Sequence, residues 1–518
     1  MPAAPPDLLA LHAAANPDKP AVIDDRAEGR ITRWSYAELN ARTNRLAHRM
    51  LELGVRSRDR VIWCGMNSPD VVAMTHAARK LGATAVPLNY RLTAEEAIYV
   101  VDNSDAAFVW ADAEHRGLFD RIRPYVPKVR EVAVFGGPCE PDMIEAEPWL
   151  AAASPEPPAP AEGDAQTMIY TSGTTGQPKG AVRTGAGDPE QVKALLAFVG
   201  YRPDDVYLST GPLYHSGPGG FMGLAFLLGN TVVLQRRFDA EDWLRLVETY
   251  RVTTTFSAPT PIRMVCSLPA AVKARYDRSS MRILVANAAP WSFALKQAYL
   301  ADFPADSLWE VYGSTELGVN TILRPEDQLR KPGSCGRPAP GVEVVLLDDD
   351  GKPVTAPRVP GELFVRSRSI FDAYHKGPDQ YEAERRGDLH TVGDVAYFDE
   401  EGFYYVCDRK KDMIISGGMN VYPAEIEAAL EQHPDVFDVA VFGIPSEEWG
   451  ESVHAVVVCR PGSALAPEQV IAFAREHLAG YKIPRSVSFI DELPRTGSGK
   501  ILKRVLREPY WADQHARV

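Results

Sequence analysis

Cysteine is scarce in this chain, with six residues in 518, and these are neither paired in spacing nor clustered with histidines. That pattern argues against a disulfide framework and a zinc site and favours thiols in a reducing cytosol. Long apolar runs are also missing, because the most apolar stretch, 221–234, is interrupted by glycines and is too short to span a bilayer. The N-terminus lacks the pattern of a signal peptide. We expect a soluble cytoplasmic protein with no integral membrane segment.

Positive charge is in deficit, since 56 Lys and Arg stand against 69 Asp and Glu, for a net charge of −13. General binders of nucleic acid or anionic membranes usually carry an excess of Lys and Arg, so we expect no nucleic-acid partner. An anionic small molecule would need local basic residues instead. The length allows about two to four domains.

Predicted strands and helices alternate along the chain. Capping boxes at 35–38 and 93–96 predict helix starts, and a further helix is predicted over 69–80. Short apolar runs between them predict strands at 60–66, 83–88 and 107–110, and later at 253–256, 282–286 and 308–312. Alternation of this kind indicates parallel βαβ units, so the predicted fold class is α/β. For 437–458 and beyond we expect short strands alternating with helices, as in a small α+β domain.

The stretch 168–180 has the composition of a phosphate-binding loop. Three glycines allow close approach of the backbone, hydroxyl groups can donate to phosphate oxygens, and Lys179 adds a positive charge. A polar surface turn needs far fewer of these residues. A nucleotide-kinase loop requires Gly, four residues and then Gly-Lys-Ser/Thr, and it fails because the lysine follows Gln177-Pro178. The loop candidates are Thr171, Ser172, Gly173, Thr174, Thr175, Gly176 and Lys179.

A second motif, at 311–316, combines the groups that a nucleotide needs. Tyr312 offers an aromatic face for adenine, Gly313 allows close approach, and Thr315 offers a hydroxyl to the α-phosphate. Magnesium prefers one or two carboxylates together with phosphate oxygens and water, so Glu316 suffices as its protein ligand.

These stretches resemble the signatures of the adenylate-forming superfamily, in particular its acyl-CoA synthetase and aryl-CoA ligase branch. Motifs in the family's order run from about residue 35 to residue 507. The resemblance implies a large N-terminal domain of α/β subdomains with a small β-barrel-like part, over 1–410. It also implies a small mobile α+β C-terminal domain, over 411–518, with a hinge near Lys411.

The resemblance also assigns residues to the nucleotide. Besides the loop and Tyr312, Gly313 and Thr315, it implies ATP contacts from Ala288, Ala289, Glu310, Asp394, Arg409 and Lys500, with the ribose gripped by Asp394 and Arg409. The catalytic set that it implies is Lys500, Thr315, Glu316 and His215. Three positions depart from the family: Asn287 and Asp408 replace the usual glycine, and Val392 replaces a hydroxyl residue.

Acid and thiol sites are implied in the same way. The acyl pocket is expected at His215, Phe221, Met222, Ala286 and Gly313, with His215 gating it and positioning the carboxylate. The pantetheine arm of CoA is expected to pass Gly417 and Gly418, with Trp449, Tyr481 and Lys482 near its nucleotide. For Trp449, a core position is an almost equal alternative.

The function implied is a two-step ligase that converts a hydrophobic carboxylic acid and MgATP to an acyl-adenylate and then transfers the acyl group to CoA. The expected cofactors and co-substrates are ATP, Mg²⁺ and coenzyme A. An enzyme that loads a carrier-protein thiol shares the nucleotide motifs, and so does a luciferase-like oxygenase. Pocket residues do not distinguish fatty, aryl and sterol acids, and a homodimer is left open.

Overall fold

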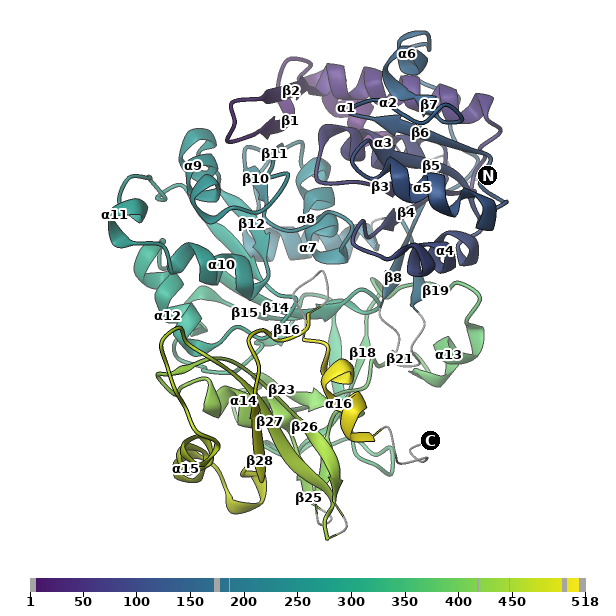
Figure 1. Cartoon of the computed structure of the whole chain (residues 1–518). Coiled ribbons are helices and arrows are strands. Elements are labelled where there is room, and N and C mark those ends of the chain that lie inside the picture. Colours follow the sequence, from purple (N-terminus) through teal and green to yellow (C-terminus); the bar gives the residue numbers. More distant parts are fainter. Residues whose placement is uncertain are drawn as a thin grey trace. The chain divides into compact units, whose positions relative to one another are not determined.

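The structure is a computed structural model of the chain, and it describes residues 6–171, 178–185, 187–416, 419–446, 448–495 and 501–511. The chain forms two compact units (Figure 1). The first unit comprises Met1–Arg330, Pro338–Val342 and Arg366–Arg386, and the second comprises Lys331–Arg337, Glu343–Val365 and Gly387–Val518. The predicted domains, 1–410 and 411–518, are defined by a hinge at Lys411 about which the C-terminal domain would move. This division stays a prediction.

Two largely parallel sheets form the first unit. The nine-stranded sheet has the order β16-β15-β14-β13-β12-β10-β11-β1-β2, and the eight-stranded sheet has the order β19-β9-β8-β4-β3-β5-β6-β7. The nine strands are β1 (Pro20–Asp25), β2 (Ile31–Ser35), β10 (Val206–Ser209), β11 (Thr231–Leu234), β12 (Thr254–Ser257), β13 (Ile283–Ala286), β14 (Leu308–Ser314), β15 (Gly318–Leu323) and β16 (Arg337–Pro338). The eight strands are β3 (Arg60–Cys64), β4 (Thr84–Leu88), β5 (Ala106–Asp112), β6 (Glu131–Phe135), β7 (Ile144–Glu145), β8 (Gln166–Thr171), β9 (Lys179–Thr184) and β19 (Ala373–Tyr374).

Helices connect and cover these strands, as the sequence predicts for an α/β fold. Both capping boxes form, with Ser35 before α2 and Thr93 before α4, and α3 covers the predicted range 69–80. The helices of this unit are α1 (Leu8–Ala15), α2 (Tyr36–Glu52), α3 (Pro69–Lys80), α4 (Ala94–Asn103), α5 (Arg116–Ile122), α6 (Ala146–Ala151), α7 (Pro189–Val199), α8 (Ser216–Leu227), α9 (Ala240–Tyr250), α10 (Pro259–Cys266), α11 (Ala270–Lys273), α12 (Phe293–Asp302) and α13 (Pro378–Ala383).

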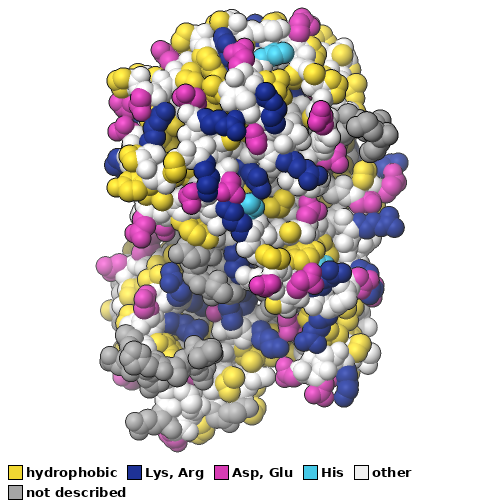
Figure 2. All heavy atoms as spheres, turned by 90° about the vertical axis from the view of Figure 1, so that its right-hand side faces the viewer, with side chains coloured by type: hydrophobic (Ala, Val, Ile, Leu, Met, Phe, Trp, Pro, Cys, Tyr) yellow, Lys and Arg dark blue, Asp and Glu magenta, His cyan; other side chains and the backbone are white. Residues whose placement is uncertain are grey.

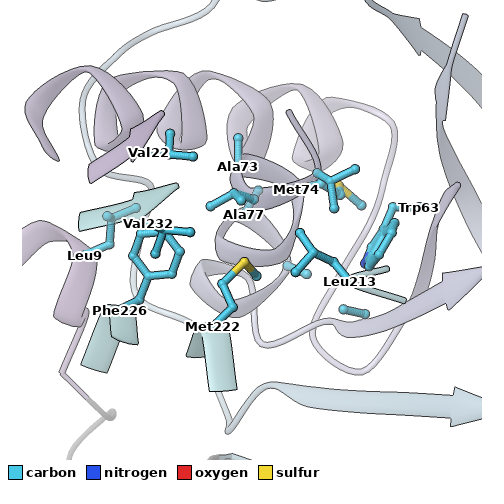
Figure 3. Packing of buried hydrophobic residues seen from close by; sticks show 14 of the residues in the cluster. Leu9, Val22, Trp63, Ala73, Met74, Ala77, Leu213, Met222, Phe226 and Val232 are labelled. Carbon is cyan, nitrogen blue, oxygen red and sulfur yellow. The ribbon is translucent and has the colours of Figure 1, made fainter. Parts of the chain in front are cut away.

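The core of the first unit follows from the alternation of side chains along the strands. In β3, Val61 and Trp63 join the cluster between the two sheets, whereas Ile62 and Cys64 join a second cluster beneath α4 and α5. Figure 3 shows the first cluster, in which residues of α3 and α8 pack together with both sheets. Helix and sheet layers therefore alternate, and both sheets are buried on two faces.

The second unit contains antiparallel strands. One group consists of β17 (Glu343–Leu347), β18 (Gly361–Arg366), β21 (Leu389–His390), β22 (Asp394–Phe398) and β23 (Tyr404–Arg409). A five-stranded sheet consists of β24 (Ile414–Ser416), β25 (Met419–Val421), β26 (Val436–Ser446), β27 (Gly450–Cys459) and β28 (Ser486–Phe489). The helices of this unit are α14 (Pro423–Leu430), α15 (Pro467–His477) and α16 (Lys503–Trp511).

The region 437–458 differs from its prediction of short strands and helices. β26 and β27 form one long antiparallel hairpin of 11 and 10 residues. Alternate side chains enter two different apolar clusters: Val439 and Val441 face one cluster, while Ala440 and Phe442 face the other. Because the strands are buried on both faces, the sequence shows a continuous apolar run with no polar alternation to mark their length.

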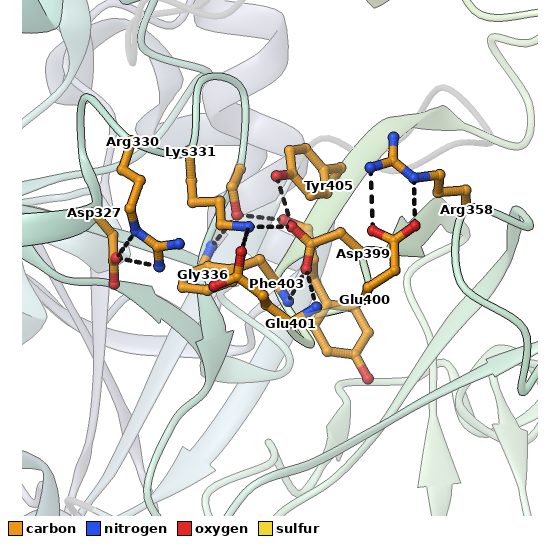
Figure 4. A network of polar contacts seen from close by, with 12 residues as sticks. Asp327, Arg330, Lys331, Gly336, Arg358, Asp399, Glu400, Glu401, Phe403 and Tyr405 are labelled. Atoms are coloured by element: carbon orange, nitrogen blue, oxygen red, sulfur yellow. Dashed lines mark hydrogen bonds and ion pairs between the residues drawn. The ribbon is translucent and has the colours of Figure 1, made fainter.

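A buried polar network lies in the turn between β22 and β23 (Figure 4). The Asp399 carboxylate accepts hydrogen bonds from Lys331 Nζ at 2.7 Å and from the backbone N–H groups of Glu401 and Phe403, each at 3.0 Å. Burial alone would raise the pKa of Asp399, but these donors hold it at about 2. The network therefore fixes the turn.

Surface properties agree with the composition. Acidic and basic side chains are interspersed on the face in Figure 2. Within the described part of the chain, none of the helices is both long and apolar enough to cross a membrane. The six cysteines are all described residues, and they are thiols rather than disulfides. The alternating helices and strands of the first unit confirm the predicted α/β fold class.

Candidate active site

The predicted phosphate loop is flanked by the ends of two paired strands. β8 ends at Thr171 and β9 begins at Lys179, and these two residues are direct partners in the antiparallel ladder. Gly180 leaves room for buried Met168, because a Cβ atom on residue 180 would lie 2.7 Å from the methionine sulfur and the Met168 side chain would have to move. The predicted Ser172, Gly173, Thr174, Thr175 and Gly176 lie outside the described residues.

The second motif forms a tight corner between β14 and β15. Gly313 cannot be replaced without moving the backbone, since a Cβ atom on it would lie 2.0 Å from the carbonyl oxygen of Gly318. This close crossing presents Thr315 and Glu316 on the connection between the two strands.

The two motifs meet, although 145 residues separate Thr171 from Glu316. Thr171 Oγ1 donates to Glu316 Oε1 at 3.0 Å, and the hydroxyl of Tyr374 lies 3.3 Å from the same oxygen. Lys179 Nζ lies 5.5 Å from the centroid of the Tyr374 ring. The structure thus brings three predicted residues together around Tyr374, which the sequence analysis missed because no motif contains it.

Arg183 holds the backbone of this corner and was also missed. Its guanidinium donates to the carbonyl oxygens of Thr315 at 3.0 Å and Glu316 at 3.4 Å, and it also bonds the carbonyl of Ser369. The backbone N–H of Phe371 donates to Glu316 O at 2.8 Å. Burial lowers the pKa of Arg183. The available sequence signal was an arginine that follows the short apolar pair Ala181-Val182 in β9.

His215 and Thr315 are linked through the start of α8. His215 is the residue before the helix, and Thr315 Oγ1 donates to Oγ of Ser216, the first helical residue, at 2.8 Å. Gly217 lets the helix approach β12, because a Cβ atom on it would lie 2.3 Å from the ring of Phe256. The predicted gate and the predicted α-phosphate residue are therefore neighbours.

Two residues predicted for the acyl pocket, Phe221 and Met222, lie on α8, whereas Ala286 belongs to the apolar cluster on the other face of the nine-stranded sheet. The ring of Phe221 stacks on Phe256 with centroids 5.0 Å apart, and Ala286 is fully buried at the end of β13. Met222 packs into the cluster between the sheets, beside Leu213 (Figure 3). The walls are apolar, and their role in binding an acid stays a prediction.

The segment predicted to lie on the adenine is held by Asn287. Its side-chain amide donates to the carbonyl oxygen of Val311 at 2.6 Å, which joins the end of β13 to β14. Ala288 follows with φ +72°, a left-handed conformation that favours glycine. The carboxylate of Glu310 pairs with buried Lys296, and burial raises the pKa of Glu310. The adenine contacts of Ala288, Ala289, Glu310 and Tyr312 stay predictions.

In the second unit, the residues predicted to grip the ribose face each other. Asp394 and Arg409 are partners across β22 and β23, with Arg409 Nε 3.4 Å from Asp394 Oδ1. Asp408 accepts from the backbone N–H of Ala424 at 3.0 Å, in the first turn of α14. A carboxylate is favourable at a helix N-terminus, which explains why aspartate suits this position. Lys411, the predicted hinge, lies two residues after Arg409.

The residues predicted for CoA have partners of their own within this unit. The guanidinium carbon of Arg485 lies 4.4 Å from the centroid of the Trp449 ring, and the ring is half-buried. Lys482 pairs with Glu425 at 2.5 Å and lies 5.4 Å from the centroid of the exposed Tyr481 ring. Gly417, Gly418 and the catalytic candidate Lys500 lie outside the described residues.

Comparison with known proteins identifies the family. Residues 9–375 match the model of the AMP-binding enzymes, and residues 425–500 match the model of their C-terminal domain. The chain belongs to the AMP-binding enzymes. Feruloyl-CoA synthase of an Amycolatopsis species is 37% identical over 484 residues, covering 92% of this chain and 94% of that protein. The long-chain-fatty-acid–CoA ligase FadD13 of Mycobacterium tuberculosis is 34% identical over 507 residues, covering 98% of each.

Solved structures agree with this membership. ATP-bound MatB from Rhodopseudomonas palustris superposes with a TM-score of 0.86 and 28% identity, covering 98% of this chain and 99% of that chain. The expected family, the α/β fold and the class of AMP-forming acid–thiol ligases are confirmed for this AMP-binding enzyme. The roles of single residues stay predictions.

Magnesium fits the donors at the corner of this AMP-binding enzyme. The described residues contain no cluster of three or more His, Cys, Asp or Glu side chains that could cage a metal by itself. Glu316 is 8% exposed, and the two hydrogen bonds to its carboxylate, from Thr171 and Tyr374, go to the same oxygen. A single carboxylate beside a phosphate loop suits Mg²⁺, which takes most of its ligands from phosphate and water.

Proposed function

We propose that this AMP-binding enzyme is an AMP-forming acyl-CoA synthetase for a hydrophobic carboxylic acid, with ATP, Mg²⁺ and CoA as its cofactor and co-substrates. The observation that carries the proposal is the convergence of Thr171, Lys179 and Glu316 in one corner. The acid attacks the α-phosphate of ATP to give an acyl-adenylate and pyrophosphate. The thiol of CoA then attacks the acyl carbon, and AMP leaves.

The first step must bring a carboxylate up to a polyanionic triphosphate. At about 4 Å, repulsion between two unit charges costs on the order of 4 kcal/mol at an effective dielectric constant of about 20. Lys179 would neutralise the β- and γ-phosphates, and Lys500 would bridge the carboxylate and the α-phosphate. Thr315 would hydrogen-bond the α-phosphate. Magnesium, held by Glu316, supplies further positive charge when bound.

The remaining residues would bind and orient. Asp394 and Arg409 would hold the ribose, and His215 would position the acid above apolar walls that include Phe221. Each buried methylene group of the acid adds about 0.8 kcal/mol, so the pocket can select by chain length. A role in fatty-acid metabolism and a cytoplasmic location belong to this proposal, the latter supported by six thiol cysteines.

Movement of the C-terminal part would separate the two steps. In this proposal Lys500 serves adenylation, and rotation about Lys411 then replaces it with Gly418 for the thiol step. We predict that Lys500→Ala slows adenylation by about 10²- to 10³-fold, the scale of losing one preorganised charged donor. Thioester formation from supplied acyl-adenylate should persist. Equal losses in both half-reactions would contradict the alternation.

The decisive experiment measures acid-dependent release of pyrophosphate over a panel of fatty, aryl and sterol acids, with and without CoA. Release of pyrophosphate together with acyl-CoA from at least one hydrophobic acid supports the proposal. Adenylate that forms but is not transferred to free CoA would indicate a carrier-protein thiol instead. Absence of pyrophosphate release with every acid would contradict the proposal.

A further inference from the structure

Tyr374 contacts three charged groups at the corner of the first unit. Its hydroxyl oxygen lies 3.3 Å from Glu316 Oε1 and 2.9 Å from Glu384 Oε2. Its ring lies under Lys179, with the Nζ atom 5.5 Å from the centroid, within the range of a cation–π interaction. One side chain therefore touches both the predicted metal carboxylate and the predicted phosphate lysine.

The protein fixes the orientation of Tyr374 without any ligand. β19 pairs antiparallel with β9, so that Tyr374 lies opposite Ala181, two residues from Lys179. The ring is 6% exposed and packs edge-on against Phe371 with centroids 4.7 Å apart. A side chain held by strand register and by packing is suited to position its neighbours.

The two carboxylates beside the hydroxyl are not equivalent. A hydroxyl group carries one hydrogen, so it donates fully to only one acceptor at a time. Glu384 is the nearer acceptor, and Gln380 Nε2 holds its other oxygen at 2.9 Å. When the hydroxyl donates to Glu384, Oε1 of Glu316 keeps only the hydrogen bond from Thr171, so the carboxylate has one donor fewer to compete with a cation.

We propose that Tyr374 is a positioning residue for MgATP, which aligns Glu316 and Lys179 with one side chain and turns its hydroxyl hydrogen toward Glu384 when the cation binds. This inference rests on the proposed function in placing ATP at this corner. It adds Tyr374 and Glu384, which lie outside the sequence motifs, to the residues that set nucleotide affinity.

The test is calorimetric titration of the full-length enzyme with ATP at several fixed concentrations of free Mg²⁺, in the absence of acid. Tyr374→Phe keeps the ring but removes the hydroxyl, and it should raise the Kd for MgATP about fivefold, the scale of one hydrogen bond. The concentration of free Mg²⁺ that half-saturates binding should rise with it. Tyr374→Leu, which also removes the ring under Lys179, should raise the Kd further.

Two comparisons separate positioning from general damage. Tyr381→Phe changes a neighbouring ring that also packs on Phe371, and it should leave the Kd unchanged. The double variant Lys179→Ala/Tyr374→Leu should lose less binding free energy for MgATP than the two single variants lose together. The effects of substitutions at coupled residues are not additive. A Tyr374→Phe enzyme with the wild-type Kd and magnesium dependence would overturn the inference.

Glu384→Gln decides the question if Tyr374→Phe does not fold. A rise of about twofold or more in the Kd for MgATP supports the inference, and an unchanged Kd overturns it. Its matched control is Glu382→Gln, which changes an exposed carboxylate two residues away. Failure of the wild-type enzyme to make an adenylate from any acid would contradict the proposed function alone, because nucleotide affinity is read separately.

Discussion

Glu316 in the first unit and Asp399 in the second are both buried carboxylates, and they differ in their donors. Asp399 accepts from the ammonium of Lys331, from two backbone N–H groups and from the hydroxyl of Tyr405. Glu316 accepts from two hydroxyls, and none of the described lysines or arginines forms an ion pair with it. A carboxylate saturated by fixed donors stabilises a turn, whereas one held only by hydroxyls keeps its charge available to a cation.

The largest effect should come from removing the open carboxylate. Glu316→Gln should slow adenylation by about 10²- to 10³-fold, because one charge-stabilising group at the triphosphate is lost. The midpoint of thermal unfolding should change little, since the two hydroxyls can still bond the amide. Pyrophosphate release and a thermal melt measure the two quantities. A Glu316→Gln variant that is strongly destabilised but normally active would show that Glu316 has a structural role and not a functional one.

The converse change is expected to affect folding only. Asp399→Asn removes the charge that Lys331 and two N–H groups bind, and it should lower the free energy of unfolding by about 1–3 kcal/mol, the scale of hydrogen bonds to a charged group. Urea unfolding measures this loss. The rate per folded molecule should equal that of the wild type, and a loss of activity like that of Glu316→Gln would contradict the distinction.

The contribution of Asp399 to the free energy of unfolding should depend on pH. The pKa of Asp399 is lowered to about 2 in the folded protein, so its contribution is fully present above about pH 4, the ordinary range of the group, and is lost as the pH falls toward 2. Unfolding free energies measured between those limits should decrease less steeply in Asp399→Asn. Identical slopes would show that Asp399 does not titrate in this way.

The smallest effect concerns backbone strain beside the first site. Ala288 has φ +72°, and Ala288→Gly removes the clash of its Cβ at the cost of a more flexible unfolded chain. We expect a gain in stability of at most about 1 kcal/mol. Thermal melts of wild type and variant provide the measurement. A clear loss of stability would mean that the alanine methyl group packs usefully in this conformation.

Local sequence predicted the regular elements of the first unit well. The ends of α3 and the caps of α2 and α4 depend on residues within one turn, and these are visible in the sequence. The hairpin of β26 and β27 was not predicted, because both of its faces are buried and no alternation marked it. Alternation of apolar and polar residues reveals a strand only where one face of the strand is polar.

The sequence by itself determined the chemistry of this protein: hydroxyls, glycines, a lysine and a carboxylate, in motifs short enough to be recognised. Only the tertiary structure decided which of them meet. Thr171 reaches Glu316 across 145 residues, and Tyr374 reaches it across 58. These contacts depend on the register of β19 on β9 and on the close crossing at Gly313, which burial of the whole sheet selects and which no local pattern encodes.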